Sequence, residues 1–365
     1  PSIAMIPSGV KASKLYSVLP TNGAGDFTTT RASVATRVNE NGLIEEVAAN
    51  VPRLDYSDGT CPSLLLEGTA TNLINYSEDF SVASWNTAST RSMTVSPSTV
   101  LDLRGGTDAF RITSTASNNQ LAAFGSVTSG LNYANSIYVR RVSGVGTINL
   151  RDVNNNSNII TLSESDGWKR IESSVLSNST NGRFYLNLST VGDVIDVWGA
   201  QLEENSYATS YIKTIGTVQT RVADTATGSG NSTVINSSEG TLFAEISAFV
   251  DGGNFELITL SDGGTANRCS IFFNVGGLSA VYKVLNANQF IHNQPANLLD
   301  FHKVAISYKQ SEFKMFVDGV KVQEQLSGNV LSANTFDRLT FDRGDGANNF
   351  KGKTKSVQVY TTALS

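Results

Sequence analysis

The chain has 365 residues, of which 40% are hydrophobic and 16% charged, and its formal net charge is −5. This length allows two domains with separate cores, while the low charge argues against a coiled coil or a charged disordered chain. No basic run is present, which argues against nucleic acid as a partner.

The N-terminal stretch PSIAMIPSGVKASKLYSVLP has no uninterrupted apolar core and carries Pro7, so it lacks the pattern of a signal peptide. No apolar run approaches the roughly 20 residues of a membrane span. We therefore expect a protein made in a cytoplasm, without membrane insertion. Residues 1–71 also lack a long alternating run, and we expect an extended arm that contacts the next domain or another subunit. Residues 41–54 could be a short helix or extended chain.

Beyond the arm, nearly every periodic signal has period two, as in GRFYLNLS (182–189) and LFAEISAFV (242–250). Asp-Gly and Ser-Asp-Gly turn signals recur at short intervals. The pattern predicts an all-β fold of two tandem antiparallel β-sandwiches (jelly rolls) preceded by the arm. The expected segments are the arm (1–71), a first sandwich (72–220), a linker rich in small polar residues (221–240) and a second sandwich (241–365).

The stretch SEFKMFVDGVKVQEQ (311–325) predicts a hairpin, because Asp318-Gly319 suits a type I′ turn with two positive φ angles. This turn chemistry explains the motif as scaffold and requires no ligand. Cys61 and Cys269 are the only cysteines; we expect two free, mostly buried thiols in different domains.

The C-terminal part resembles the concanavalin A-like (laminin G-type) jelly roll over roughly residues 238–365. In that family a V-D-G hairpin precedes a closing strand that ends in A-L-S. The matching residues are Val317, Asp318, Gly319, Gly352, Val357, Val359, Tyr360, Ala363, Leu364 and Ser365. The fold serves lectins, glycosidases and spacers alike, so the resemblance implies the fold more than a function.

A second resemblance covers roughly residues 72–215. WGAQLEENSYATSYIKT (198–214), WKRIESSV (168–175) and TNLINYSEDFSVASW (71–85) resemble the carbohydrate-binding-module-like jelly roll of bacteriophage tail and virion proteins. DFTTTRASVATRVNENGLIEEVAANVPRLDY (26–56) and CPSLLLEGTATNL (61–73) resemble the segment that precedes this module. Together these resemblances imply a phage virion protein with two lectin-like sandwiches.

No pattern of catalytic residues stands out. Glycosidases need two carboxylates facing one sugar, whereas Glu164 and Asp166 fall in a turn and the adjacent Glu203 and Glu204 point opposite ways on a strand. We therefore expect a protein that is not an enzyme. Jelly rolls of this type often hold a structural Ca²⁺, and Asp262 and Asp345 in Gly-rich loops are its candidate ligands.

Sugar binding needs an exposed aromatic ring beside amide or carboxylate groups. Trp85, Trp168 and Trp198 lie in fold motifs and are expected in the core. The segment NANQFIHNQ is predicted to be a loop that offers such a ring. The candidate glycan-binding residues are Phe290, Asn288, Gln289, His292 and Asn293, with Tyr282 and Tyr133 as further loop aromatics.

The resulting hypothesis is a structural protein on the virion surface, as a tail fibre, head fibre or decoration, that binds host or environmental glycans to aid adsorption. Through the arm, the protein is expected to contact other virion proteins. The further expected partners are cell-surface glycans and additional copies of the chain in a homo-oligomer such as a trimer. The alternatives are a decoration protein without a ligand and, less favoured, a polysaccharide depolymerase.

Overall fold

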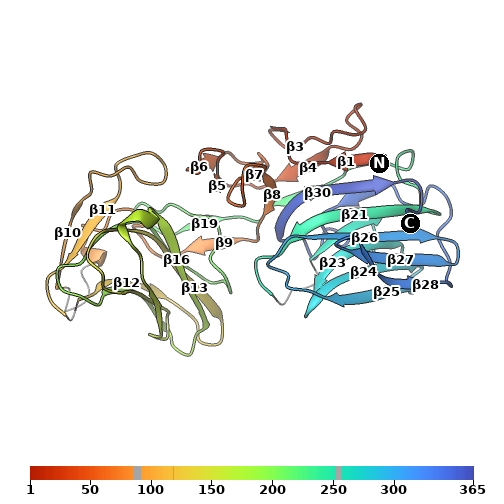
Figure 1. Ribbon diagram of the computed structural model, residues 1–365. Coiled ribbons are helices and arrows are strands. Elements are labelled where there is room, and N and C mark those ends of the chain that lie inside the picture. The colour runs from red at the N-terminus through yellow and green to blue at the C-terminus, as the bar shows by residue number, and fades with distance from the viewer. Residues whose placement is uncertain (86–91, 118, 252–255) are drawn as a thin grey trace. The chain divides into compact units, whose positions relative to one another are not determined.

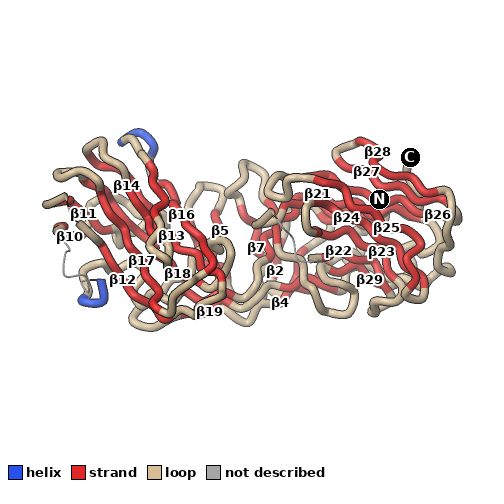
Figure 2. The backbone as a smooth tube through the Cα atoms, turned by 90° about the horizontal axis from the view of Figure 1, so that it is seen from below, coloured by secondary structure: helices blue, strands red, loops and turns tan. Residues whose placement is uncertain are grey.

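A computed structural model describes residues 1–85, 92–117, 119–251 and 256–365. It divides the chain into two compact units: unit 1 (residues 1–40, 47–68 and 223–365) and unit 2 (residues 41–46 and 69–222). Within the described residues, the regular structure is strands plus two single-turn 3₁₀ helices, η1 (Ala83–Trp85) and η2 (Glu164–Asp166), drawn in blue in Figure 2. The predicted all-β fold is confirmed. None of the described helices has the length and apolarity needed to cross a membrane.

Unit 1 is a sandwich of two antiparallel sheets (Figure 1). The larger sheet runs β28 (Val320–Gln325), β27 (Glu312–Val317), β26 (His302–Lys309), β21 (Gly240–Ser247), β30 (Gly352–Tyr360), β8 (Ser63–Leu66) and β7 (Arg53–Asp55), with β1 (Ile3–Met5) also paired to β30. The smaller sheet runs β25 (Ala287–Pro295), β24 (Gly277–Val284), β23 (Arg268–Asn274), β22 (Leu257–Ser261) and β29 (Arg338–Thr340). A third sheet contains β2 (Val10–Lys11), β3 (Lys14–Leu15), β4 (Phe27–Thr30) and β20 (Thr225–Thr227).

Unit 2 is the second sandwich. One sheet runs β10 (Met93–Pro97), β11 (Phe110–Ser114), β18 (Val194–Glu203), β13 (Asn132–Ser143) and β16 (Lys169–Leu176). The other runs β12 (Leu121–Ser126), β17 (Asn181–Leu188), β14 (Ile148–Arg151) and β15 (Ser157–Ile160). A short antiparallel pair, β9 (Ala70–Asn72) with β19 (Gln219–Arg221), joins the two ends of the segment 69–222. Two further strands, β5 (Ala35–Val38) and β6 (Ile44–Val47), precede β7 along the chain.

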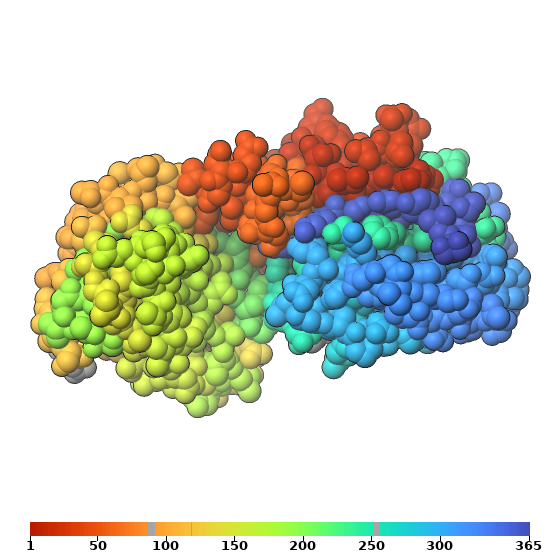
Figure 3. Space-filling model, viewed as in Figure 1, coloured from red at the N-terminus to blue at the C-terminus, as the bar shows by residue number. Residues whose placement is uncertain are grey.

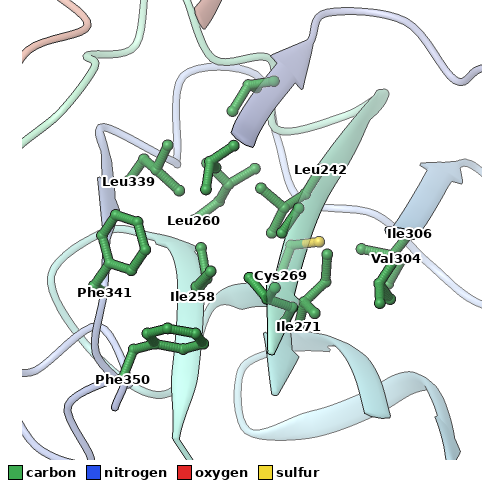
Figure 4. Close-up of a cluster of buried hydrophobic side chains, with 14 of the residues drawn as sticks. Leu242, Ile258, Leu260, Cys269, Ile271, Val304, Ile306, Leu339, Phe341 and Phe350 are labelled. Atoms are coloured by element: carbon green, nitrogen blue, oxygen red, sulfur yellow. The ribbon is translucent and has the colours of Figure 1, made fainter. Parts of the chain in front are cut away.

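Alternation along the strands produces the cores. On β21, Leu242, Ala244 and Ile246 are buried, as the period-two pattern predicts. Figure 4 shows Leu242 beside residues from several other strands of unit 1, including Ile271 and Ile306. Trp85 and Trp198 are buried in unit 2, whereas Trp168 is only half-buried. Both cysteines are free and both lie in unit 1; Cys269 is buried, but Cys61 is exposed, contrary to expectation.

The N-terminal segment belongs to the sandwich of unit 1. Strand β30 pairs with β21 along one side, while its other side pairs with β8 through Gly352–Thr354 and with β1 through Val357–Val359. Figure 3 shows the red N-terminal residues directly against the dark blue C-terminal strand. The expected arm thus contributes three strands, β1, β7 and β8, to the larger sheet. Residues 41–54 are extended in β6 and β7, with no helix.

The expected linker at 221–240 is also part of the folded units. Asp224, Ala226, Ser229 and Ile235 are buried, and Ala226 belongs to β20. Small polar composition predicts an exposed connection, but small residues also suit a tightly hydrogen-bonded buried segment. The Ser229 hydroxyl, for example, donates to the carbonyl of Gly25 at 2.7 Å.

Candidate ligand site

The aromatic side chains expected to face a sugar are buried. Phe290 is 1% exposed and stacks on Phe313, with ring centroids 6.0 Å apart. Tyr282 lies in the same core, where its hydroxyl donates to the carbonyl of Ser237 at 2.6 Å, and Tyr133 is buried in unit 2. The prediction that these rings are exposed is wrong, because the supposed loop is strand β25 and alternation turns Phe290 inward.

The polar residues predicted around Phe290 are divided between the two sides of β25. His292 shares the side of Phe290, whereas Asn293 lies on the outer face. Gln289 is the extra residue of a β-bulge, which shifts the strand register. Asn288 lines a pocket on the outer face of the smaller sheet.

The two candidate calcium ligands do not form a metal site. Asp345 receives a two-point ion pair from Arg343, at 3.2 and 2.6 Å, which lowers the pKa of this carboxyl. Asp262 accepts from the backbone N–H of Gly264 (3.0 Å) and from the amide of Asn267 (2.8 Å). In the described part of the chain, no group of three His, Cys, Asp or Glu side chains is placed to hold a metal ion. The oxygens of both carboxylates take part in hydrogen bonds that shape the loops.

A pocket of about 310 Å³ lies on the outer face of the smaller sheet of unit 1. Its floor is apolar and is made by Leu257, Phe272 and Val281, which form a small cluster separate from the main core. The rest of the lining consists of three cationic side chains, two amide side chains and one aliphatic side chain. We call this the basic pocket; these other lining residues are Arg268, Lys283, Arg343, Asn288, Asn348 and Ile291.

The local sequence explains why two of the cations meet. Strands β23 and β24 form a hairpin in which Asn274 faces Gly277, so residues equally far from the turn face each other. Arg268 is therefore directly opposite Lys283 on the same face of the sheet. Like charges in this arrangement destabilise a sheet, which makes the pair costly as pure scaffold.

Arg343 is paired with Asp345, whereas the charges of Arg268 and Lys283 are poorly compensated. Burial lowers the pKa of Lys283, and the charges of Arg268 and Arg343 lower it further. Burial and Arg343 also lower the pKa of Arg268, with Asp345 acting in the opposite direction. Within the described residues, the Nε of Arg268 is buried without a hydrogen-bond partner. A buried N–H of this kind needs an acceptor, and the pocket contains no carboxylate beside it to act as one.

This arrangement can bind an anion that also carries an apolar face. A carboxylate could accept from the guanidinium of Arg268 and the ammonium of Lys283, which would relieve their mutual repulsion. The C–H groups of a sugar ring could then lie over Ile291 and the apolar floor, with Asn288 available for hydroxyl groups. The sequence contained a signal for this site, since the hairpin register alone places residue 268 opposite residue 283.

The family comparison supports the fold of this region. Residues 217–365 match the model of the Concanavalin A-like lectin/glucanases superfamily. The fold there is a concanavalin A-like jelly roll, as the resemblance implied. A comparison with curated proteins found no match.

Several solved structures are similar to parts of the chain. One is CBM40 of the Ruminococcus gnavus IT-sialidase, at 17% identity over 35% of this chain and 78% of that chain, with a TM-score of 0.30. Another is domain 4 of AbnA, an extracellular arabinanase from Geobacillus stearothermophilus, in complex with arabinotriose, at 11% identity over 44% and 80% of the chains and a TM-score of 0.31. A third is a SAP-like pentraxin from Limulus polyphemus, at 11% identity over 36% and 67% of the chains and a TM-score of 0.29.

Proposed function

We propose that unit 1 binds an acidic sugar in the basic pocket and that the protein acts without catalysis, as a glycan-binding structural protein of a bacteriophage particle. The binding role rests on the pair Arg268 and Lys283, two cations that face each other above an apolar floor. Within the described chain, neither cation forms a salt bridge that would balance its charge. The family match is consistent with this role, because the superfamily includes lectins.

The virion assignment rests on sequence motifs in unit 2, above all WGAQLEENSYATSYI. In this proposal the protein is exposed on the particle, as a fibre or a decoration, and binds glycans of the host surface. Immunogold labelling of intact particles with an antibody against this chain tests the assignment directly. Specific labelling supports it, and its absence from particles that are labelled for a known surface protein contradicts it.

The binding role is tested with the full chain on an array that presents acidic and neutral glycans. We expect carboxylate-bearing sugars to bind the wild type and to lose about tenfold or more in affinity in Arg268→Gln. Lys303→Gln is the matched control, because it removes one positive charge from an exposed position on β26, in the opposite sheet. If both variants bind acidic glycans as the wild type does, the pocket is not the site.

A ligand-free decoration protein is the second candidate function. One observation favours it: the N-terminal segment exposes several apolar side chains, namely Ile6, Tyr16, Val18 and Leu19. Such residues could pack on another virion protein. In that case, particles that lack this chain would adsorb normally to host cells, whereas the binding role predicts weaker adsorption.

The depolymerase alternative has its own test. Purified protein incubated with host surface polysaccharide should release no reducing ends if it only binds. Release of reducing ends that persists after further purification would establish catalysis and overturn the non-enzymatic part of the proposal.

A further inference from the structure

Unit 2 contains a separate pocket of about 380 Å³. One wall is formed by two antiparallel segments, 75–78 and 213–216, which are held together by the bridge between Tyr76 and Ile215 and by backbone hydrogen bonds. The opposite wall comes from the end of β10 and the start of β11. The lining residues are Tyr76, Glu78, Asp79, Pro97, Thr107, Asp108, Phe110, Lys213, Thr214 and Ile215.

The charge of this pocket is opposite to that of the basic pocket, and we call it the acidic pocket. Glu78 is held by Lys213 at 2.5 Å and accepts from the Tyr211 hydroxyl at 2.9 Å. Asp79 and Asp108, in contrast, form no ion pair within the described chain. Asp79 accepts from the N–H and hydroxyl of Ser81, whereas the carboxylate of Asp108 is exposed.

The acidic pocket also offers apolar surface. The rings of Tyr76 and Phe110 are half-buried, so each retains an accessible part, and Phe110 is anchored edge-on against the buried ring of Phe80. Ile215 is 74% exposed. Aromatic rings beside carboxylate acceptors suit a sugar, whose C–H face lies on the rings while its hydroxyl groups donate to the carboxylates.

We propose that the acidic pocket is a second binding site, for a neutral sugar, independent of the acidic-sugar site in unit 1. Asp79 and Asp108 repel a carboxylate-bearing sugar, which excludes the ligand class that we assign to the basic pocket. Neighbouring hydroxyl groups of an uncharged pyranose can donate to these oxygens without that penalty.

The test uses the full chain and a panel of neutral, amino-bearing and acidic monosaccharides, with binding followed by ligand-observed NMR. We expect neutral sugars to bind weakly, with dissociation constants on the order of millimolar. Asp108→Ala should weaken this binding by about tenfold, because an acceptor of the sugar hydroxyls is lost. Ile215→Lys should weaken it as well, and both positions are exposed, so folding should be preserved.

The controls separate this site from the basic pocket. Glu164→Ala removes an exposed carboxylate of unit 2 that does not line the pocket, and it should leave neutral-sugar binding unchanged. Arg268→Gln should weaken acidic-sugar binding about tenfold or more and leave neutral-sugar binding unchanged. The proposal is overturned if no neutral sugar binds the wild type, if only amino sugars bind, or if Asp108→Ala and Ile215→Lys leave neutral-sugar binding intact.

Discussion

The two sandwiches place their pockets on different parts of the fold and give them opposite charge. In unit 1 the pocket lies on the outer face of a sheet, between strands and the loop at 343–348, and it gathers three cations. In unit 2 the pocket lies beside strand ends, and its uncompensated charges are the carboxylates of Asp79 and Asp108. The same all-β architecture thus leaves the ligand class open, and a few side chains at particular register positions decide it.

The units also differ in how the chain closes them. Unit 1 joins its three segments through Asp224, which ion-pairs with Arg53 of segment 47–68 and Arg31 of segment 1–40. In the ion pair with Arg31, the Nη1 atom lies 2.8 Å from Oδ1 of the Asp224 carboxylate. Arg53 is 0% exposed and also ion-pairs with Glu67. Unit 2 uses an amide for a similar purpose, since Asn72 donates to the carbonyls of Ala200 (3.1 Å) and Ile212 (2.9 Å). Removing one partner of a buried ion pair lowers the free energy of unfolding far more than removing one partner of a neutral hydrogen bond.

Asp224→Asn should therefore have the largest effect and should act on unit 1 alone. We expect a loss of about 3–5 kcal/mol, because the substitution removes the negative charge that two buried guanidinium groups, those of Arg31 and Arg53, contact. All three tryptophans lie in unit 2, so their fluorescence reports its unfolding, while labelling of the buried thiol of Cys269 in a Cys61→Ser background reports unit 1.

In denaturant, the thiol should become accessible at a much lower concentration in Asp224→Asn, while the fluorescence transition stays where it is. Asp337→Asn is the control, because it weakens an exposed pair with Arg338 that should contribute less than about 1 kcal/mol. A shift of both transitions together would mean that the two units unfold cooperatively.

Gly319→Val tests whether the Asp318-Gly319 hairpin is scaffold. Both residues have positive φ, 51° and 81°, as the type I′ prediction requires. A β-branched side chain at position 319 should destabilise unit 1 by roughly 1–3 kcal/mol. Acidic-sugar binding by the folded fraction should be unchanged, since the turn lies in the sheet opposite the basic pocket. A loss of affinity without a change in melting would reassign the hairpin to a site.

The double variant Arg268→Gln/Lys283→Gln separates binding from stability. Binding of acidic sugars should fall by about tenfold to a hundredfold, because both charge-assisted hydrogen bonds are lost. The free energy of unfolding should stay constant or rise by a few tenths of a kcal/mol, since facing like charges are removed. Neutral-sugar binding in unit 2 serves as the internal control. A clear loss of stability would indicate that the two cations support the sheet.

Local features of this fold could be predicted from the sequence, whereas distant pairings could not. Period-two alternation identified strands such as β21, and Asp318-Gly319 identified a turn. The closure of β30 by β1 depends on only three residue pairs more than 350 positions apart, and Ile3–Met5 is too short to show a period. Asp224 lies in a polar stretch, and only its contact with Arg53 reveals its importance.

The site was misplaced for a similar local reason. The turn between β24 and β25 places Leu285 and Asn286 at φ values of 48° and 68° without a glycine, so the hairpin has no strong sequence signal. The sequence pattern therefore predicts a loop around Phe290, where the structure has strand β25. The facing pair Arg268 and Lys283, in contrast, follows from the Val275-Gly276 turn and could have been found by counting back from it.

The smallest expected effect is a pH dependence that only unit 1 can show through histidine, because both histidines of the chain, His292 and His302, lie there. The Nδ1 of His302 lies 2.7 Å from the Asp318 carboxylate and its Nε2 lies 2.9 Å from the carbonyl of Asn297. Burial alone would lower the pKa of His302, but these two acceptors raise it on balance. Only the protonated ring can donate to both.

His302 therefore contributes its full stabilisation below its unfolded pKa of about 6.5, and this contribution is lost as the pH rises through the higher folded pKa. Asp318 behaves in the opposite sense. Burial raises the pKa of its carboxyl, but the hydrogen bonds from His302 and from the backbone N–H of Lys303 outweigh burial and lower the pKa on balance. The stabilisation that Asp318 contributes is therefore lost only as the pH falls through this lowered pKa. Since Asp318 is half-exposed, the total change should stay below about 1 kcal/mol. Thiol labelling of Cys269 across pH 6–9, corrected for the thiolate fraction, should show stability falling with pH in the wild type and a flatter dependence in His302→Gln. Equal slopes in the two proteins would show that the His302–Asp318 contact does not stabilise unit 1.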